Sequence, residues 1–472
     1  MEQIQAFIDS ANDVLWGQLL IYLLLGTGAF FTIRTGVIQL RLFGRGWTEM
    51  TRGLRHGAAG DITPFQAFAT GMASRVGTGN IVGVAMAISL GGPGAVFWMW
   101  MTALLGMASA LVESTLAQIF KVPHGDATFR GGPAYYIQLG LRQRWLGVLF
   151  ALALLLAFGF VFNAIQANSI AAALHEAYGI APATVGIGLV VLTALIIFGG
   201  IRSVAVVTEF MVPLMALFYL GLALYAVAAN FRAVPGILVL ICKSAFGFGP
   251  ATAGFLGYSL AQAMTLGVKR GLFSNEAGMG SAPNAAATAA ATHPATQGIL
   301  QMFGVFVDTM VVCTCTALLI LLSGDFVAGG PLAGVALVQA AMQTHVGSWG
   351  KHFLVLAVFF FAFSSVLGNY AYAEVNVDFL KGNKLLIGVF RLLVLAMVYF
   401  GAVSSVPFVW SLGDLSQALM AIINLVAILL LSGVALKVIQ DYERQLKAGI
   451  VTPVFSRSQL PEVAAKLPQG VW

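Results

Sequence analysis

Two glycine-rich segments interrupt stretches that are otherwise apolar enough to form helices inside a membrane. The first is Val76-Gly77-Thr78-Gly79-Asn80, and the second is Asn275-Glu276-Ala277-Gly278-Met279-Gly280. Glycines let a helix unwind, and an unwound segment in lipid leaves backbone N–H and C=O groups in need of other partners. Freed carbonyls suit a dehydrated Na⁺, while the N-terminus of the following half-helix attracts a carboxylate. The two segments therefore predict a site that binds a cation together with a zwitterionic solute.

Polar side chains recur in other apolar stretches, where such groups face the interior of a helix bundle. Asn163 and Gln166 are three residues apart and share one helix face. The amide oxygen of Asn80 is predicted to coordinate a cation, and Asp308 to neutralise a cation or the substrate ammonium. Further polar candidates are Asn168, Thr309, Ser364, Ser365 and Asn369. For each of them the alternative is an interhelical hydrogen bond that only holds the bundle together.

Several ionisable residues also fall inside or beside the apolar stretches. Glu276 lies within the second interruption and is expected to cap the half-helix beyond it. Asp308 could pair with Arg75 for purely structural reasons, so both roles of Asp308 stay open. The roles of Arg75, Lys269 and Arg270 are not fixed by the sequence.

The composition places these segments in lipid. Of the 472 residues, 59% are hydrophobic and 9% are charged, whereas soluble domains carry ~25% charged residues. The formal charge of +6 is spread over short loops, so it indicates membrane topology and no nucleic-acid partner. Cys242, Cys313 and Cys315 lack the spacing of a disulfide framework or a zinc site. We expect no cofactor and no transition metal, with Na⁺ as the only metal ion and H⁺ as a possible coupling ion.

The apolar runs predict about eleven membrane-spanning helices. They begin near Val14, Phe65, Ala95, Trp145, Ala181, Glu209, Ala253, Gly298, Phe353, Leu385 and Pro407. Segments 231–250 and 329–352 are expected to be external loops with short amphipathic helices. Because cytoplasmic loops are enriched in Lys and Arg, the first loop, the third loop and the tail are predicted to be cytoplasmic. The N-terminus, which lacks the basic region of a cleaved signal, is then external, in the inner membrane of a cell.

The two interruptions lie five spans apart, at corresponding places in two halves of the chain. Such pairs point to an inverted-repeat transporter with its site near the membrane midplane. The predicted organisation is an extra helix and basic loop (1–62), a first repeat (63–232), a second repeat with external helices (233–437) and a cytoplasmic tail (438–472). The fold class is thus an all-α polytopic membrane protein with a 5+5 inverted repeat and two broken helices.

The strings around these segments resemble one known family. They are Thr63-Pro64-Phe65-Gln66-Ala67, Val76-Gly77-Thr78-Gly79-Asn80-Ile81, Gly91-Gly92-Pro93-Gly94-Ala95-Val96-Phe97-Trp98-Met99-Trp100, Gly131-Gly132-Pro133-Ala134-Tyr135-Tyr136 and Arg270-Gly271-Leu272-Phe273-Ser274-Asn275-Glu276-Ala277-Gly278-Met279-Gly280-Ser281-Ala282-Pro283. The chain resembles the bacterial alanine or glycine:cation symporters from about Thr63 to the end of its last span. The resemblance implies a leucine-transporter-like fold, alternating access, and uptake of alanine or glycine driven by Na⁺, with H⁺ used by some members.

The resemblance also implies particular site residues. The predicted substrate-binding residues are Thr78, Gly79, Asn163, Gln166, Asn275, Gly278, Gly280, Ser365 and Asn369. The predicted cation-binding residues are Ala73, Val76, Asn80, Asp308, Ser364 and Ser365. Asn369 stands where many members of the family carry a tryptophan, so the pocket is expected to be wider or more polar. Arg75 is also unlike the commonest residue at its position.

Other readings of the same residues remain open at this point. A proton-coupled transporter of another small zwitterion would use the same interruptions. An ion channel could use a Gly-Thr-Gly ring as a filter, although such filters need several copies of the loop around one axis. An intramembrane hydrolase would need a histidine beside Ser281, and His293 is the nearest candidate in the sequence. We predict that the protein is not an enzyme. The sequence does not fix its oligomeric state.

Overall fold

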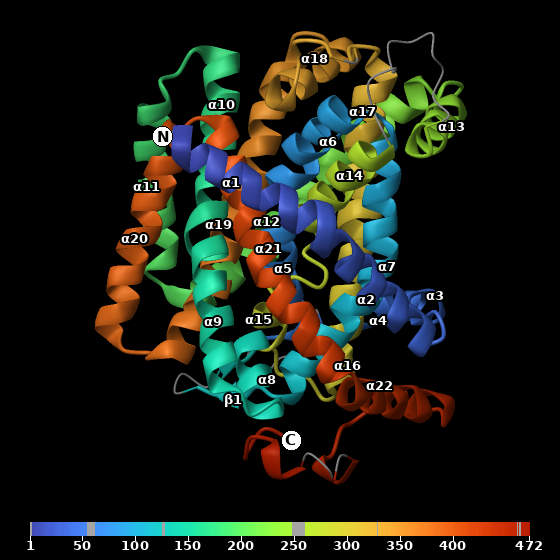
Figure 1. Cartoon of the computed structure of the whole chain (residues 1–472), viewed down its shortest axis with the longest axis vertical. Helices are drawn as coiled ribbons and strands as arrows, with labels where there is room; N and C mark the ends of the chain where they lie inside the picture. Colours follow the sequence, from blue (N-terminus) through green and yellow to red (C-terminus); the bar gives the residue numbers. More distant parts are fainter. Residues whose placement is uncertain are drawn as a thin grey trace.

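The structure is a computed structural model in which almost every ordered element is a helix. It describes residues 2–53, 62–124, 128–247, 260–327, 329–459, 461 and 464–472. The helices stand side by side as a tall bundle (Figure 1). The described residues contain one sheet, formed by the two-residue strands β1 (Val122–Pro123) and β2 (Phe129–Arg130), which pair antiparallel. The predicted all-α class is confirmed.

The first third of the chain forms the following elements in order: α1 (Glu2–Val14), η1 (Leu15–Leu20), α2 (Ile21–Arg34), α3 (Ile38–Arg41), α4 (Phe43–Gly53), α5 (Pro64–Arg75), η2 (Gly79–Gly83), α6 (Val84–Gly91), α7 (Gly94–Ile119), α8 (Pro133–Gly140), α9 (Arg144–Leu154), η3 (Leu155–Val161) and α10 (Phe162–Tyr178). The middle forms α11 (Pro182–Ile197), α12 (Gly200–Ala229), α13 (Val234–Ala245), α14 (Leu260–Asn275), α15 (Ala282–Ala286), α16 (Pro294–Val305), η5 (Phe306–Cys313) and α17 (Thr314–Ser323). The remainder forms α18 (Gly334–Val346), α19 (Trp349–Leu380), α20 (Lys384–Val403), α21 (Val406–Leu430), α22 (Ser432–Lys447), η6 (Arg457–Gln459) and η7 (Ala464–Lys466).

Eight helices in the described part of the chain are long and apolar enough to cross a membrane. They are Gln3–Arg34, Gly94–Ile119, Arg144–Tyr178, Gly200–Ala229, Pro294–Ser323, Trp349–Leu380, Lys384–Val403 and Val406–Leu430. Each corresponds to one of the eleven predicted spans. The other three are α11, which has 16 residues, and the two interrupted spans, whose pieces are shorter. The chain is therefore a multi-pass membrane protein.

The helices extend beyond the apolar runs that predicted them. The sixth predicted span begins at Gly200 and not near Glu209, and the ninth begins at Trp349 and not near Phe353. An apolar run marks only the part of a helix that lies in hydrocarbon, whereas the hydrogen-bonded backbone continues to the next breaker or cap. The start predicted near Ala253 lies outside the described residues. Segments 231–250 and 329–352 do contain short helices, α13 and α18.

Both predicted interruptions are present. Helix α5 ends at Arg75, and the chain resumes as the π-helical turn η2 at Gly79. Helix α14 ends at Asn275, and six residues separate it from α15. The intervening residues Glu276, Gly278 and Gly280 have φ angles of 57°, 84° and 84°. Right-handed helices exclude these angles, so this stretch cannot be a continuous helix.

The two halves of the chain repeat one order of elements. From α5 and again from α14, an interrupted helix is followed by a long helix, a short helix (α8 or α18) and three further helices. The repeat bounds 63–232 and 233–437 stay predictions. That the two halves are inverted relative to each other stays a prediction.

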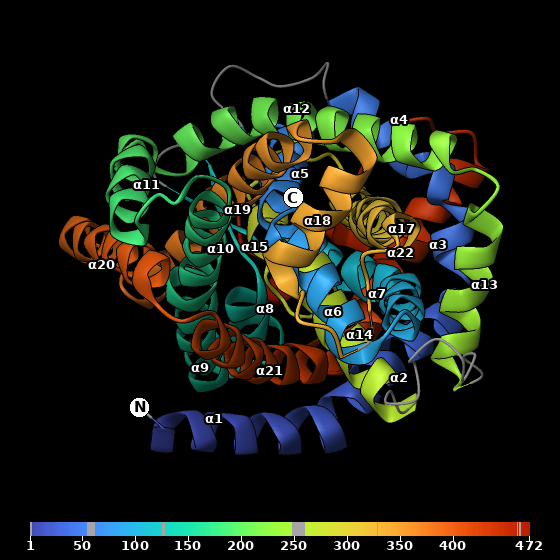
Figure 2. The same cartoon turned by 90° about the horizontal axis from the view of Figure 1, so that it is seen from above.

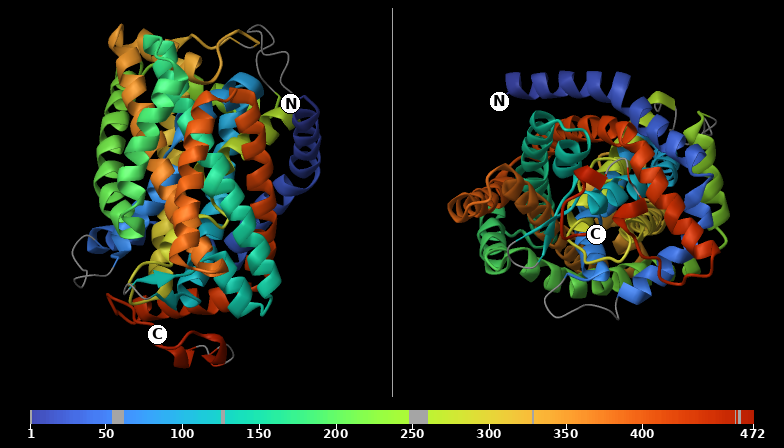
Figure 3. Two further views of the ribbon diagram at one scale, coloured as in Figure 1. Left: turned by 90° about the vertical axis from the view of Figure 1, so that its left-hand side faces the viewer. Right: turned by 90° about the horizontal axis from the view of Figure 1, so that it is seen from below.

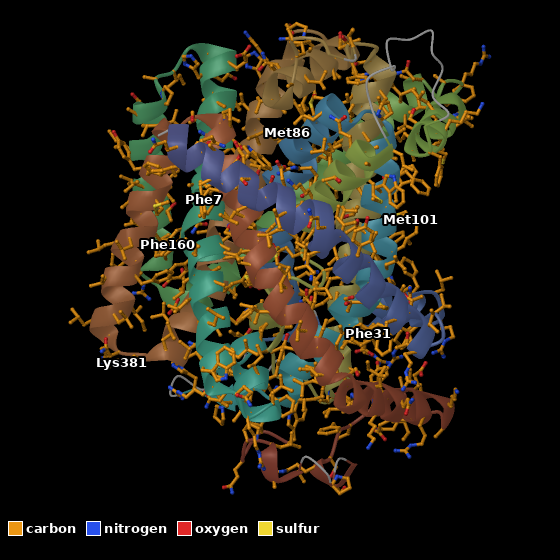
Figure 4. The ribbon with its side chains drawn as sticks, viewed as in Figure 1. Phe7, Phe31, Met86, Met101, Phe160 and Lys381 are labelled. Carbon is orange, nitrogen blue, oxygen red and sulfur yellow. The ribbon has the colours of Figure 1, made fainter. Side chains whose placement is uncertain are left out.

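The two ends of the bundle differ in their charged residues and in the short helices that lie across them. Helices α13 and α18 lie at one end, and α8 and α22 at the other (Figures 1 and 3). Lys381 lies at the α22 end (Figure 4), as does the C-terminal segment. Helix α1 lies along the outside of the bundle (Figure 2), where Asn12 donates to the Ser411 carbonyl at 2.9 Å. That the α22 end faces the cytoplasm stays a prediction.

The C-terminal segment packs against the loop between α15 and α16. The Phe455 N–H donates to the Thr292 carbonyl at 3.0 Å, and the Phe455 and Trp472 rings lie 5.4 Å apart. His293, whose side chain is fully buried, lies 3.3 Å from the Asp441 carboxylate of α22. Burial lowers the pKa of His293 from 6.5 to about 4. His293 is therefore neutral at neutral pH.

We expect the His293→Asn variant to unfold with a weaker dependence on acid than the wild type. The unfolded chain binds a proton near pH 6.5 and the folded chain only near pH 4. The free energy of unfolding therefore falls as the pH drops between these values, by about 2 kcal/mol at pH 5. Asparagine keeps the cap that His293 provides to the Ala295 N–H but does not titrate. Thermal unfolding midpoints at pH 7 and pH 5 test this, and equal losses in both proteins would contradict it.

Candidate functional site

The two interruptions lie against each other in the middle of the bundle. A methyl group on Gly79 would lie 2.9 Å from the Phe273 ring and 3.2 Å from Ser274 Cα, at the end of α14. Ser74, one turn before the first interruption, donates to Glu276 Oε1 at 2.6 Å. The two unwound stretches therefore share one buried centre, as the sequence predicted.

The first interruption is held by two amide side chains. The Gly77 N–H donates to Asn80 Oδ1 at 2.9 Å, and the Thr78 N–H donates to Gln166 Oε1 of α10 at 3.1 Å. Val76 forms the end of α5 with φ −77° and ψ 79°. In the structure the Asn80 oxygen that was predicted to coordinate a cation thus accepts a backbone N–H.

Asp308 forms a compact polar cluster with the residues around the first interruption. Its carboxylate accepts from Asn80 Nδ2 at 2.6 Å, from Ser274 Oγ at 2.7 Å and from Thr309 Oγ1 at 2.7 Å. Asn80, Ser274, Thr309 and Asp308 are all fully buried. A buried carboxylate with hydroxyl and amide oxygens beside it has the chemistry of a site for a hard cation or a proton. Within the described residues, Asp308 forms no ion pair with Arg75.

The second interruption is held by a carboxylate that was not among the predicted site residues. Glu113 of α7 accepts from the N–H groups of Gly278 at 3.1 Å and Gly280 at 3.2 Å. Asn424 of α21 donates to the same carboxylate at 2.8 Å and also to the Gly278 carbonyl at 2.9 Å. In this structure the predicted anion-binding N–H groups of Gly278 and Gly280 are therefore used by the protein's own carboxylate.

A second chain of hydrogen bonds joins the interruptions to α10 and α19. Ser74 Oγ lies 2.6 Å from Glu276 Oε1 and 2.7 Å from Asn369 Oδ1, and Asn369 Nδ2 donates to Asn163 Oδ1 at 3.1 Å. The other oxygen of Glu276 accepts from Ser281 Oγ at 2.7 Å. Glu276 thus bridges two hydroxyls and does not cap the backbone of α15, so the expectation of a cap was wrong. Asn163 and Asn369 are brought together as predicted site residues.

Five oxygen atoms gather where α19 crosses the end of α5. Ser365 Oγ lies 3.0 Å from the Ala73 carbonyl, 2.9 Å from the Ser74 carbonyl and 3.0 Å from the Phe361 carbonyl. Ser364 Oγ lies 3.3 Å from the Ala73 carbonyl and 2.9 Å from the Phe361 carbonyl. Main-chain carbonyls at the C-terminal end of a broken helix, here those of Ala73 and Ser74, coordinate Na⁺ in transporters of this build, and the serine hydroxyls add further oxygen atoms. The cluster unites the predicted Ala73, Ser364 and Ser365.

Two polar atoms at the meeting point have no partner within the described part of the chain. They are Thr78 Oγ1 and Asn275 Nδ2, and both residues are fully buried. A buried donor without a partner costs about 1–3 kcal/mol, so such groups commonly mark where a ligand binds. One atom is on each interruption, and together they offer a hydroxyl and an amide N–H to a small polar solute.

Arg75 lies beside the first interruption with an incomplete set of partners. Its Nη1 donates to the Gln301 carbonyl at 3.1 Å, whereas Nε and Nη2 have no hydrogen-bond partner among the described residues. The side chain is 1% exposed. Glu113, Glu276 and Asp308 place three buried carboxylates on the two interruptions.

Aromatic rings and an ion pair cover the site towards the α18 end. The Phe162 and Phe273 rings lie 4.7 Å apart, and the Phe273 and Trp410 rings 5.0 Å apart. The Arg270 guanidinium lies 4.8 Å from the Trp410 ring and 2.7 Å from the Asp414 carboxylate of α21. Lys269 also lies 3.6 Å from that carboxylate. Arg270 and Lys269 thus join α14 to α21 over the site.

Several residues of the centre were absent from the predicted set. They are Ser74, Glu113, Ser274, Phe361 and Asn424. Phe361 could have been found, because its carbonyl lies one turn before Ser364 and Ser365 on a single helix. Glu113 carried the general signal of an ionisable residue in a span, but nothing in the sequence linked it to Gly278, which is 165 residues away.

Comparison with known proteins decides the class. A model described as the sodium:alanine symporter family matches residues 1–457. The chain belongs to this family. It is 53% identical to an uncharacterized transporter of Haemophilus influenzae, over 99% of this chain and 96% of that protein. It is 50% identical to the probable sodium/glutamine symporter GlnT of Bacillus subtilis, over 98% and 95%. It is 39% identical to the sodium/alanine symporter AgcS of Methanococcus maripaludis, over 91% and 95%.

Membership of the sodium:alanine symporter family makes the chain a cation-coupled amino-acid transporter and not an enzyme. The geometry agrees, because Ser281 donates to Glu276, whereas His293 contacts Asp441 and the Ala295 N–H. The hydrolase reading is therefore wrong. The channel reading also fails, since the family consists of symporters.

Proposed function

We propose that this symporter imports a small neutral amino acid, alanine or glycine, together with Na⁺ by alternating access. The oxygen cluster around Ser365 carries the proposal, because it joins a hard-cation site to the first interruption through the Ala73 and Ser74 carbonyls. An ion there would stabilise the unwound chain and so favour binding of the amino acid at Thr78 and Asn275. A ligand shifts a conformational equilibrium only through different affinities for the two states.

The solute would contact both interruptions and a polar wall. Thr78 Oγ1 and Asn275 Nδ2 would meet its charged groups, while Asn163 and Asn369 lie on the α10 and α19 side. A relative that is 50% identical is named for glutamine, and an amide-lined wall would suit a longer polar side chain. Glutamine is therefore the most informative competitor. The proposal requires no cofactor, and it places the protein in the inner membrane with its N-terminus outside and its α22 end in the cytoplasm.

Uptake into proteoliposomes tests the proposal. Radiolabelled alanine should accumulate at least tenfold faster under an inward Na⁺ gradient than under an equal K⁺ gradient. Unlabelled glycine should compete, and D-alanine and glutamine define the limits of the pocket. Uptake that needs only an inward H⁺ gradient would replace Na⁺ with H⁺ as the coupling ion. Competition by glutamine alone would transfer the substrate assignment to glutamine.

The Ser365→Ala variant should need at least tenfold more Na⁺ for half-maximal uptake. It removes the hydroxyl that lies within 3.0 Å of three carbonyls. The KM for alanine at saturating Na⁺ should change less, because the variant loses an ion ligand. A matched control is Ser169→Ala on α10, where a buried hydroxyl bonds only the Ile165 carbonyl one turn earlier. Equal Na⁺ dependence in Ser365→Ala and wild type would exclude the cluster as the ion site.

A further inference from the structure

A hollow of about 490 Å³ lies between α12 and α19, on the outside of the bundle. Helix α12 runs along the periphery, with α19 inside it (Figure 2). The lining comes from Leu214–Leu222 on α12, Val346 on α18 and Trp349–Phe361 on α19, and is almost entirely hydrocarbon and aromatic. Its volume lies within the ~300–1,000 Å³ of small-molecule sites.

The hollow opens towards lipid. At its rim, Phe218 is 61% exposed and Leu356 is 58% exposed, and both lie within helices that cross the membrane. Side chains exposed on such helices face hydrocarbon, so hydrocarbon is what enters the hollow. Deeper in the hollow lie Met215 and Tyr219, which are 3% and 1% exposed. Lipid that only packs against the outer surface of the bundle would not reach Met215 and Tyr219.

One end of the hollow carries groups typical of a membrane surface. Trp349 and His352 begin α19 at the α18 end, and their rings lie 5.9 Å apart. The Tyr178 hydroxyl lies 2.6 Å from His352 Nδ1. Tryptophan and tyrosine at a span's end mark the headgroup level of a bilayer. The hollow therefore has a polar end at the surface and an apolar depth, which matches a single lipid molecule.

The inner wall of the hollow is part of the transport site. Phe361 lines the hollow with its ring, and its carbonyl accepts from Ser364 and Ser365. Met215, which also lines it, has its sulfur 3.5 Å from Ser364 Oγ. The Tyr219 hydroxyl lies 2.6 Å from Thr316 Oγ1, which donates to the Asn80 carbonyl at 2.6 Å. The wall thus touches both the oxygen cluster and the first interruption.

We propose that this hollow binds one phospholipid acyl chain from the leaflet at the α18 end, and that the chain sets the apparent Na⁺ affinity of transport. The acyl chain packs on Phe361, Met215 and Tyr219 and fixes their positions. Their polar atoms in turn hold Ser364 and Thr316 beside the site. The proposed binding of a lipid depends only on the hollow, whereas the proposed effect on Na⁺ affinity rests on the proposed function.

Lipid binding in the hollow is tested by crosslinking with a phosphatidylcholine that carries a diazirine midway along one acyl chain. The full-length protein is reconstituted in vesicles of phosphatidylethanolamine and phosphatidylglycerol with this probe, irradiated, and mapped by mass spectrometry. Adducts are expected on Met215 or Tyr219. Ala357→Phe, which adds a ring inside the hollow, should reduce them at least fivefold. Ala396→Phe on the lipid-exposed face of α20 is the matched control and should leave them unchanged.

Adducts confined to exposed residues such as Phe218 would overturn the proposal, as would adducts on Met215 that persist in Ala357→Phe. Leu222→Trp, which narrows the rim of the hollow, is a second variant, and size-exclusion profiles confirm that each variant folds.

In uptake assays, Ala357→Phe should shift the Na⁺ concentration for half-maximal uptake at least threefold, and Ala396→Phe should not. If Ala357→Phe loses the adducts but keeps the wild-type Na⁺ concentration for half-maximal uptake, only the proposed effect on Na⁺ affinity is refuted. Wild-type protein that binds the probe but shows no Na⁺-driven uptake would refute the proposed function and leave the lipid site intact.

Discussion

Replacing Glu113 with glutamine should reduce the initial rate of amino-acid uptake about a hundredfold. The carboxylate accepts hydrogen bonds from Gly278, Gly280 and Asn424, all inside the bundle. A glutamine amide would turn an N–H₂ group towards at least one of these donors. Breaking a buried charged network costs about 3–5 kcal/mol, and 1.4 kcal/mol corresponds to a factor of ten. The substitution should therefore reduce the fraction of molecules in which the second interruption is correctly folded.

The measurement is Na⁺-driven uptake at equal amounts of reconstituted protein, together with the thermal unfolding midpoint. Glu176→Gln is the control, since Glu176 is exposed at the end of α10, and it should transport normally. Wild-type uptake by Glu113→Gln would show that the carboxylate does not hold the second interruption in the working protein.

The Gly77→Ala variant should also lose uptake, by a factor of up to about a hundred. A methyl group at this position collides with Ser365 Oγ and lies 3.2 Å from Gln166 Oε1. Both neighbours are buried; Gln166 accepts from the Thr78 N–H of the interruption, and Ser365 is hydrogen-bonded to the Ser74 carbonyl near the end of α5, so moving either one breaks a hydrogen bond beside the site. Overpacking of this kind costs about 1–3 kcal/mol in a core, and here it acts directly on the ion and solute positions.

Gly188→Ala on α11 is the control, because nothing lies within 4 Å of the added methyl group. The double variant Gly77→Ala with Ser365→Ala removes the colliding oxygen. It should recover much of the unfolding midpoint of the wild type but not its Na⁺ dependence. Failure of the double variant to regain any stability would show that the collision with Ser365 is not the cause.

The positions of the interruptions could be predicted because glycine and amide clusters in apolar stretches have a local physical signature. Glu276 illustrates the limit of local reasoning. Its place at the end of α14 suggested a cap, but its positive φ of 57° turns its carboxylate towards Ser74 and Ser281. The partner Ser74 is 202 residues away, and only the packing of α5 against α14 and α15 brings it there.

Asn80 also shows that residue type alone did not predict the contacts of a side chain. Its residue type suited a cation ligand, yet its oxygen accepts the Gly77 N–H and its nitrogen donates to Asp308. An amide can both donate and accept, so residue type alone does not decide which of its groups faces a ligand. The grouping of Ser364 and Ser365 with Ala73 was predicted from the resemblance to the symporter family, because nothing in the local sequence links residues that are 291 and 292 positions apart.

The closeness of Gly77 and Gly79 to their neighbours also restricts how this carrier could be re-engineered. Beside the proposed solute position, the space next to Gly77 is closed by Ser365, and the space next to Gly79 by Phe273 and Ser274. Variants selected for bulkier cargo should therefore accumulate changes at Asn163 and Asn369, whose amides can be shortened without moving the main chain. Libraries that randomise the glycines would consist mostly of inactive clones, whereas libraries restricted to the α10–α19 wall would be the productive ones.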